Sequence, residues 1–60
     1  MDNRIATVYV YKDTELLLTT QIFGQWINVI ADVYLDWENS PYSLVIEYDG
    51  KTLKVNNAGN

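Results

Sequence analysis

The sequence predicts an α+β fold: a small antiparallel sheet of two hairpins with one amphipathic helix packed across it, in the order ββαββ. Three patterns support this prediction. Residues 5–21 are rich in strand formers, residues 22–37 repeat apolar side chains at a helical period, and Asp49-Gly50 separates two further alternating runs. The alternative order is βαββ, in which residues 16–18 belong to a longer helix.

The first hairpin is predicted from residues 5–11 and 16–21, which favour strands. The polar residues 12–15 between them are expected to form a four-residue loop. A helix that began at Glu15 would have its apolar stripe interrupted by polar or small residues, so we prefer a strand here. Gly24 is the expected bend between strand and helix, because glycine costs about 1 kcal/mol in a helix interior. The interrupting residues are Thr19, Thr20, Gln21 and Gly24.

The helix is predicted from residues 22–37, the strongest pattern in the chain. At about 100° per residue, its apolar side chains fall within roughly 160° of arc. Both tryptophans lie on this side and are expected in the core, whereas Leu35 lies alone on the polar side. The helix should end near Asn39, because Pro41 disfavours helical angles at Ser40. The apolar arc contains Ile22, Phe23, Trp26, Ile27, Val29, Ile30, Val33, Tyr34 and Trp37. The opposite side carries Gln25, Asn28, Asp32, Asp36 and Asn39.

The second hairpin is predicted at residues 43–55, because Asp49-Gly50 favours a type I′ turn. That turn fixes the register, with Tyr48 facing Lys51. Ile46 then faces Leu53 and Leu44 faces Val55. One face of this hairpin, expected in the core, carries Leu44, Ile46, Leu53 and Val55, and the other, expected in solvent, carries Val45, Glu47, Thr52 and Lys54.

The first hairpin is apolar on both faces, unlike the second. One face is expected to hold Val8, Val10 and Leu17, and the other Ile5, Tyr9, Tyr11, Leu16 and Leu18. The sequence leaves open which of them is the core. A single helix covers only one side of a sheet, so either assignment leaves an apolar surface that needs a second cover.

The length and composition predict one domain over residues 1–60. For a 6.9 kDa chain, the free energy gained by burying apolar area is about 90 kcal/mol, close to the conformational entropy cost of ordering the chain. Small domains with so narrow a margin are usually stabilised by disulfides, a structural metal or association. The chain has no cysteine and no histidine, which excludes disulfides and ordinary zinc sites. Association, most simply as a homodimer, is the remaining route.

The charge and hydropathy of the chain exclude several classes of partner. Four basic and eight acidic residues give a net charge of −4, which repels nucleic-acid phosphates and anionic membranes. No apolar run is long enough for a membrane span, and the alternating pattern after residue 4 predicts no secretory signal. A cytoplasmic location is therefore the default expectation.

The residue inventory also argues against an enzyme. Without histidine or cysteine, the usual nucleophile, base and metal arrangements are missing. Asp32 and Asp36 lie one helical turn apart, but an exposed helix face supplies no further oxygen ligands for a cation. The three glycines are scattered, so no phosphate-binding loop is expected. We therefore expect no catalytic residues, no metal and no cofactor.

These expectations lead to a non-catalytic protein-binding protein. Its most concrete form is a small acidic inhibitor of a larger enzyme, of the kind that viruses and mobile elements direct against host-defence or nucleic-acid-processing proteins. The alternative is a self-associating structural or adaptor protein with no enzyme target. The expected interface residues are Tyr9, Tyr11, Leu16, Leu18 and Leu35, which are apolar, and Asp32, Asp36 and Glu38, which are acidic. Together with Glu47 and Asp49, the acidic residues are hypothesised to line up and imitate nucleic-acid phosphates.

Overall fold

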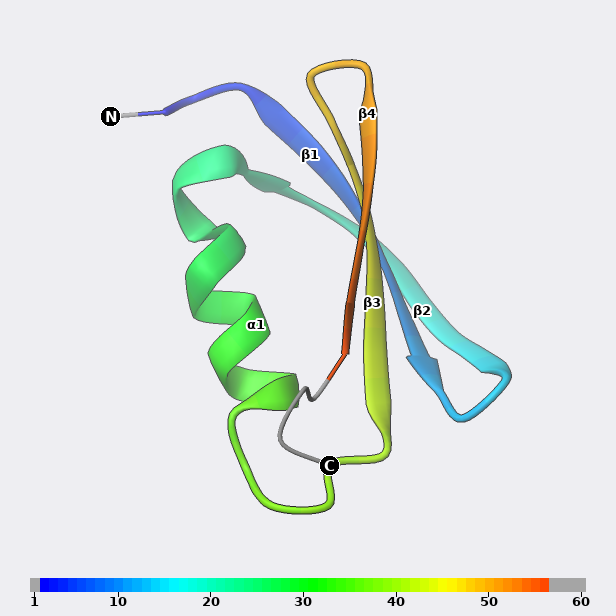
Figure 1. Cartoon of the computed structure of the whole chain (residues 1–60). Coiled ribbons are helices and arrows are strands. Elements are labelled where there is room, and N and C mark those ends of the chain that lie inside the picture. The colour runs from blue at the N-terminus through cyan, green and yellow to red at the C-terminus, as the bar shows by residue number, and fades with distance from the viewer. Residues whose placement is uncertain (1, 57–60) are drawn as a thin grey trace.

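Residues 2–56 are described by a computed structural model, which contains a four-stranded antiparallel sheet and one helix (Figure 1). The strand order across the sheet is β2-β1-β3-β4. The predicted α+β fold and its ββαββ order are confirmed, and the βαββ alternative is wrong. The elements are β1 (Ile5–Lys12), β2 (Glu15–Phe23), the 3-10 turn η1 (Gly24–Trp26), α1 (Ile27–Leu35), β3 (Tyr42–Tyr48) and β4 (Lys51–Asn56).

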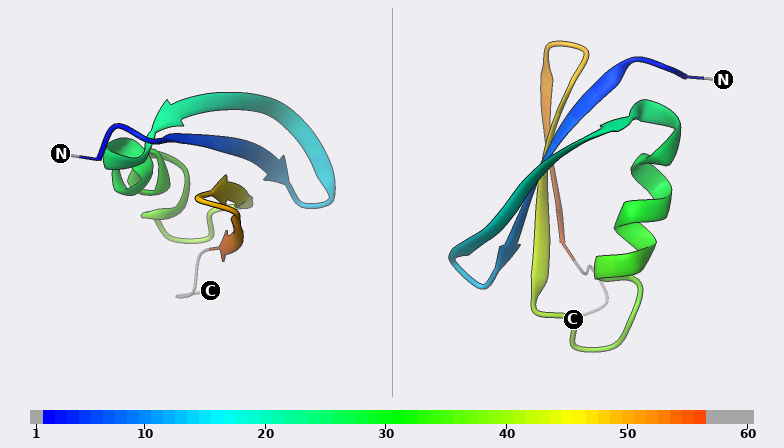
Figure 2. Two further views of the ribbon diagram at one scale, coloured as in Figure 1. Left: turned by 90° about the horizontal axis from the view of Figure 1, so that it is seen from above. Right: turned by 180° about the vertical axis from the view of Figure 1, so that it is seen from behind.

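The core lies between α1 and one face of the two central strands. In β1 the buried side chains alternate with more exposed ones, as expected for a strand with only one face covered. The face that carries Val8 and Val10 is therefore the core face. The sequence alone did not decide between this face and the tyrosine face. Figure 2 shows α1 on this one side of the sheet, far from the loop that joins β1 to β2. The buried side chains are Ala6, Val8, Val10, Leu35, Leu44 and Ile46.

The first hairpin differs from its prediction in the loop and in the register. Lys12 pairs with Glu15, so the loop has two residues rather than four, and opposite charges face each other where it begins. Tyr11 pairs with Leu16 and Val10 with Leu18, which leaves Leu17 without a partner in β1. This β-bulge moves Leu18 to the core face of the sheet. The predicted grouping of Leu18 with the tyrosines, and of Leu17 with the valines, is therefore wrong.

The helix begins later than predicted because the β1–β2 ladder continues through the first predicted helical residues. Ile22 pairs with Ala6, and Phe23 pairs with Ile5. The chain then bends at Gly24, as predicted, and the Gly24 amide donates to the Arg4 carbonyl at 2.7 Å. A Cβ at position 24 would lie 2.6 Å from Tyr48 Cε1 and 2.7 Å from Asp2 Oδ2, so the close packing here requires glycine.

The helix is also rotated relative to its prediction. Leu35 is only 7% exposed and is the buried residue of α1, whereas Val33 is 65% exposed. The prediction that Leu35 lies on a solvated polar side is therefore wrong, as is the core placement of both tryptophans, which are almost half exposed. Against the core the helix packs Leu35, with Ile27, Ile30, Ala31 and Tyr34. One edge of the predicted apolar arc is therefore buried, while the other edge, with Val29 and Val33, is exposed.

The helix ends at Leu35, before the predicted end near Asn39. Residues 36–41 form a loop in which Asn39 has a positive φ of 60°, an angle that asparagine tolerates. The Ser40 hydroxyl donates to the Tyr34 carbonyl and accepts from the Tyr42 amide, which ties the end of α1 to the start of β3. Helical hydrogen bonding therefore gives way to side-chain bonding before Pro41 is reached.

The second hairpin has the predicted turn and register, but its apolar face is buried only in β3. Leu53 and Val55 are 43% and 36% exposed, because β4 lies at the end of the sheet, so their expected core placement is wrong. Tyr48 pairs with Lys51, Ile46 with Leu53 and Leu44 with Val55. Asp49 has a φ of 53° and Gly50 a φ of 75°, as a type I′ turn requires.

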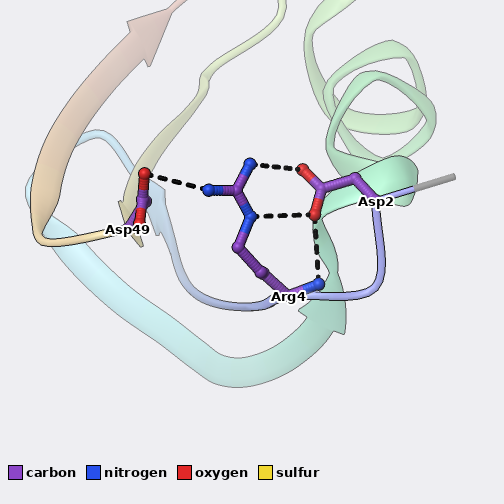
Figure 3. Close-up of polar contacts among 3 residues, drawn as sticks. All are labelled: Asp2, Arg4 and Asp49. Atoms are coloured by element: carbon purple, nitrogen blue, oxygen red, sulfur yellow. Dashed lines mark hydrogen bonds and ion pairs between the residues drawn. The ribbon is translucent and has the colours of Figure 1, made fainter.

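The residues before β1 connect to this turn through Arg4 (Figure 3). The Arg4 guanidinium forms ion pairs with Asp2 at 3.2 Å and with Asp49 at 3.0 Å. It also lies 5.0 Å from the centre of the Tyr48 ring, within cation–π distance. Hydrogen bonds from the Arg4 side chain and amide lower the pKa of Asp2, and the same partnership raises the pKa of Arg4. One basic residue thus joins the start of the chain to the β3–β4 turn.

Candidate protein-binding surface

The face of the sheet that points away from α1 is the candidate functional surface. We call it the open face. Because side chains alternate along a strand, the register assigns its members directly. Within residues 2–56 no helix covers it (Figure 2). Its members are Ile5, Thr7, Tyr9, Tyr11, Leu16, Thr19, Gln21, Phe23, Ser43, Val45, Glu47, Thr52, Lys54 and Asn56.

The apolar side chains of the open face form two cross-strand pairs on β1 and β2. Ile5 faces Phe23 at one end, and these side chains are 52% and 47% exposed. Tyr11 faces Leu16 at the other end, where Leu16 is 47% exposed. Facing residues of antiparallel strands have Cβ atoms about 4.5–5.5 Å apart, so each pair forms one continuous apolar contact surface.

Tyr9 lies between these two pairs and links β1 to β3. Its hydroxyl donates a 2.7 Å hydrogen bond to Glu47 Oε1. This bond to the carboxylate, together with desolvation and the negative charge of Glu47, raises the pKa of Tyr9. Thr7 and Gln21 add a second polar contact, in which Gln21 Nε2 donates to Thr7 Oγ1 at 3.4 Å. The open face therefore combines apolar area with oriented polar groups, as interface cores do.

The structure brings together three of the apolar residues that the sequence predicted for an interface. Tyr9, Tyr11 and Leu16 lie on the open face. Leu18 is 41% exposed but lies on the opposite face, because of the bulge. Leu35 is in the core and is not available to a partner in this conformation.

The acidic residues do not form the expected single row. Asp32, on α1, and Asp36 and Glu38, in the following loop, are all exposed. Glu47 lies on the open face, with Tyr9, and Asp49 is paired with Arg4 in the β3–β4 turn. That turn and the loop after α1 are at opposite ends of the molecule (Figure 1). Of the predicted row, only the three carboxylates of the helix and its following loop therefore lie in one region.

The sequence reasoning missed a second exposed apolar surface, which we call the helix stripe. Its four residues were assigned to the core, but each is 47% exposed or more. The sequence did contain a signal for this surface, because the apolar arc of roughly 160° is wider than the about 100° that a helix needs to pack on one side. The helix stripe consists of Trp26, Val29, Val33 and Trp37.

The remaining features of the described residues concern metal ligands, hollows and helix length. Among residues 2–56, no group of three or more His, Cys, Asp or Glu side chains is placed to hold a metal ion. A hollow of about 220 Å³ lies between β3 and β4, and Lys54 is the charged residue among those that line it. In the same part of the chain, no helix is both long enough and apolar enough to cross a membrane.

Comparisons with family models, curated proteins and solved structures give no significant match to this chain.

Proposed function

We propose that this chain is a non-catalytic protein-binding protein that contacts a larger protein through the open face. The observation that carries the proposal is the set of large apolar side chains on this face, Ile5, Leu16 and Phe23, each close to half exposed beside two tyrosines. Exposed apolar side chains interspersed with polar groups on one face are typical of an interaction surface.

The open face suits a protein partner better than a small ligand. It is a sheet surface, whereas small ligands are usually bound in concave pockets that bury most of their area. Tyrosine side chains bring large apolar area with a hydroxyl that stays hydrated or bonded, as Tyr9 does with Glu47. Thr7 and Gln21 supply polar groups within the same area.

The concrete form of the proposal is an acidic inhibitor of a larger enzyme, including an enzyme that processes nucleic acid. The net charge of −4 and the exposed Asp32, Asp36 and Glu38 favour a partner with a basic surface. Because two other carboxylates are engaged by Tyr9 and Arg4, charge steering by the helix and its loop is a better description than imitation of a phosphate row.

Affinity capture followed by mass spectrometry tests this proposal. We expect the wild-type chain to retain a defined larger protein, and Tyr11→Asp to lose it, because this change places a charge in one of the two apolar pairs of the open face. Val33→Asp is the matched control, since it places the same charge on the helix stripe, where the side chain is 65% exposed. Equal capture by the wild type and Tyr11→Asp, both folded by circular dichroism, would exclude the open face.

Ionic strength provides the test of the inhibitor form. If the acidic residues steer association, the association rate with the captured partner should fall steeply as salt is added. An association rate that does not change with salt would contradict a basic partner surface. It would not contradict binding through the open face.

The second candidate is a self-associating structural or adaptor protein. It is favoured by the three consecutive leucines at the start of β2, which are between 41% and 47% exposed on an outer strand of the sheet. For this candidate, the complex is made of copies of the chain itself, and its stability rises with protein concentration.

A further inference from the structure

Strand β2 has one free edge. Among residues 2–56 it lies at the end of the sheet and pairs only with β1, so its outward backbone N–H and C=O groups have no strand partner in that part of the chain. Seven of its nine residues are exposed. The group that satisfies such an edge is another extended strand, because its backbone groups recur at the matching spacing.

The two edges of the sheet differ in how they are protected. Strand β4, at the other end, carries Lys51 and Lys54, and edge lysines oppose pairing with another chain. In β2 the single charge is Glu15, its first residue, and the next eight residues contain neither charge nor proline. The bulge at Leu17 interrupts only the start of this edge. Natural sheets usually protect a free edge, so the regular segment beyond the bulge, which carries no such protection, indicates a partner strand.

We propose that β2 pairs antiparallel with β2 of a second copy of this chain, so that two sheets join into one of eight strands. This deepens the self-association candidate and does not depend on the open face binding another protein.

A symmetric pair of this kind has a defined register. The two-fold axis is perpendicular to the joined sheet, so facing residues must lie on the same side of it. The bulge at Leu17 and the turn at Gly24 limit the regular part of β2 to residues 18–23. Two pairings of five residues fit within those limits, one centred on Thr20 and one on Gln21. We choose the one centred on Thr20, in which Thr20 faces its own copy and the apolar Leu18 faces Ile22 of the partner subunit.

The charge distribution favours a second copy at this edge. The chain is acidic overall, so two copies repel each other where carboxylates face. In the register centred on Thr20, residues 18–22 of both copies are uncharged, and Glu15 lies beyond the paired segment. The edge of β2 is thus a place where two copies meet without opposing like charges.

The area available predicts a weak dimer. A standard interface buries about 800 Å² per partner, which is about a fifth of the 4311 Å² surface of this chain. A single strand edge with the exposed Leu17 and Leu18 covers less than that. The dimer should therefore dissociate on dilution, which makes its assembly measurable.

The joined sheet would keep both helices on one side, because the axis is perpendicular to it. The open faces of both copies would then be continuous on the other side. A dimer of this geometry doubles the surface that carries Tyr9, Tyr11 and Leu16.

Sedimentation equilibrium from roughly 1 μM to 1 mM protein tests the proposal, since this range covers weak dimers. We expect a concentration-dependent dimer in the wild type. Thr20→Lys should raise the dissociation constant at least about tenfold, because it opposes two ammonium groups at the axis. Thr52→Lys is the matched control on β4 and should leave the constant unchanged. A monomer throughout the range, or equal effects of the two changes, would overturn the proposal.

A cysteine cross-link decides the case in which Thr20→Lys fails to fold. The chain has no cysteine, so Thr20→Cys introduces a single thiol that faces its own copy at the two-fold axis. Facing positions in antiparallel strands bring Cβ atoms close to disulfide spacing. Mild oxidation should then give a covalent dimer much faster for Thr20→Cys than for Thr52→Cys. Equal rates of cross-linking for the two variants would exclude pairing in this register.

Discussion

Tyr9 and Glu47 form a side-chain bridge between β1 and β3, in which the phenol donates to the carboxylate at 2.7 Å. The two residues are diagonal neighbours, because Tyr9 faces Val45 and Glu47 faces Thr7 in the register. Diagonal neighbours in a sheet are within reach of aromatic side chains. The bond holds the Tyr9 ring across β3, with its apolar surface on the open face.

This bridge predicts a loss of stability at high pH. The pKa of Tyr9 is raised from 10.0 by its hydrogen bond to Glu47, so the stabilising contribution is complete below pH 10 and is lost as pH rises through the raised value. The free energy of unfolding, measured in urea between about pH 8 and pH 11, should fall more for the wild type than for Tyr9→Phe. Tyr11→Phe serves as the control and should follow the wild type. Parallel curves for wild type and Tyr9→Phe would contradict the bridge.

The ion pair at the start of the chain predicts a loss at low pH. Hydrogen bonds from Arg4 lower the pKa of Asp2 below 3.8, so its contribution is present above that value and is lost as pH falls through the lowered one. Asp2→Asn removes this titration. The wild type should be more stable than Asp2→Asn near pH 6, and the difference should shrink on acidification below about pH 3.8. A difference in unfolding free energy that does not change with pH would show that the Asp2 charge has no role.

The orientation of α1 predicts that truncation lowers the free energy of unfolding strongly at Leu35 and hardly at all at Val33. Leu35→Ala should cost about 2–5 kcal/mol, because it leaves a cavity in the core. Val33→Ala should change the free energy of unfolding by less than about 0.5 kcal/mol, because Val33 is 65% exposed. Chemical denaturation of both variants is the measurement. Similar losses for the two would mean that the helix packs with another side.

A substitution at Gly24 should destabilise the fold through steric overlap and not through backbone strain. Gly24→Ala should cost about 1–3 kcal/mol, because the new methyl group would overlap the Tyr48 ring edge and the Asp2 carboxylate. Gly50→Ala is a contrasting control, since a Cβ there meets nothing within 4 Å and only its φ of +75° is strained. Adding Asp2→Ala to each should reduce the cost of Gly24→Ala and not that of Gly50→Ala. Full additivity in both backgrounds would argue against contact between Asp2 and position 24.

The parts of the fold that the sequence predicted well are those where two independent signals agree. In the second hairpin, the Asp49-Gly50 turn and the alternation of apolar residues require the same register, and the structure has it. Gly24 was placed at the bend because both neighbouring patterns break there.

The parts that failed are those where one segment satisfies two patterns. Ile22 and Phe23 fit the helical arc and the strand equally, and the strand prevails because β1 extends far enough to pair with them. The consecutive residues Leu16, Leu17 and Leu18 are identical, so no sequence signal marks the bulge that divides them between two faces.

The side of α1 that is buried could not be predicted from the sequence for a similar reason. Its apolar residues span more of the helix surface than one sheet can cover, so the pattern did not determine which part would be buried. Of the residues predicted for an interface, Tyr9, Tyr11 and Leu16 share a face of the sheet, whereas Leu35 lies in the core.

The lysines of β4 have a consequence for the size of any assembly. A sheet with two receptive ends recruits chains without limit and grows into a fibre. Here Lys51 and Lys54 oppose pairing at the β4 end of the sheet. Pairing through the β2 end is therefore complete once one further chain has bound. Because only one of the two outer strands accepts another chain, the assembly stops at a closed pair and does not extend into a cross-β polymer.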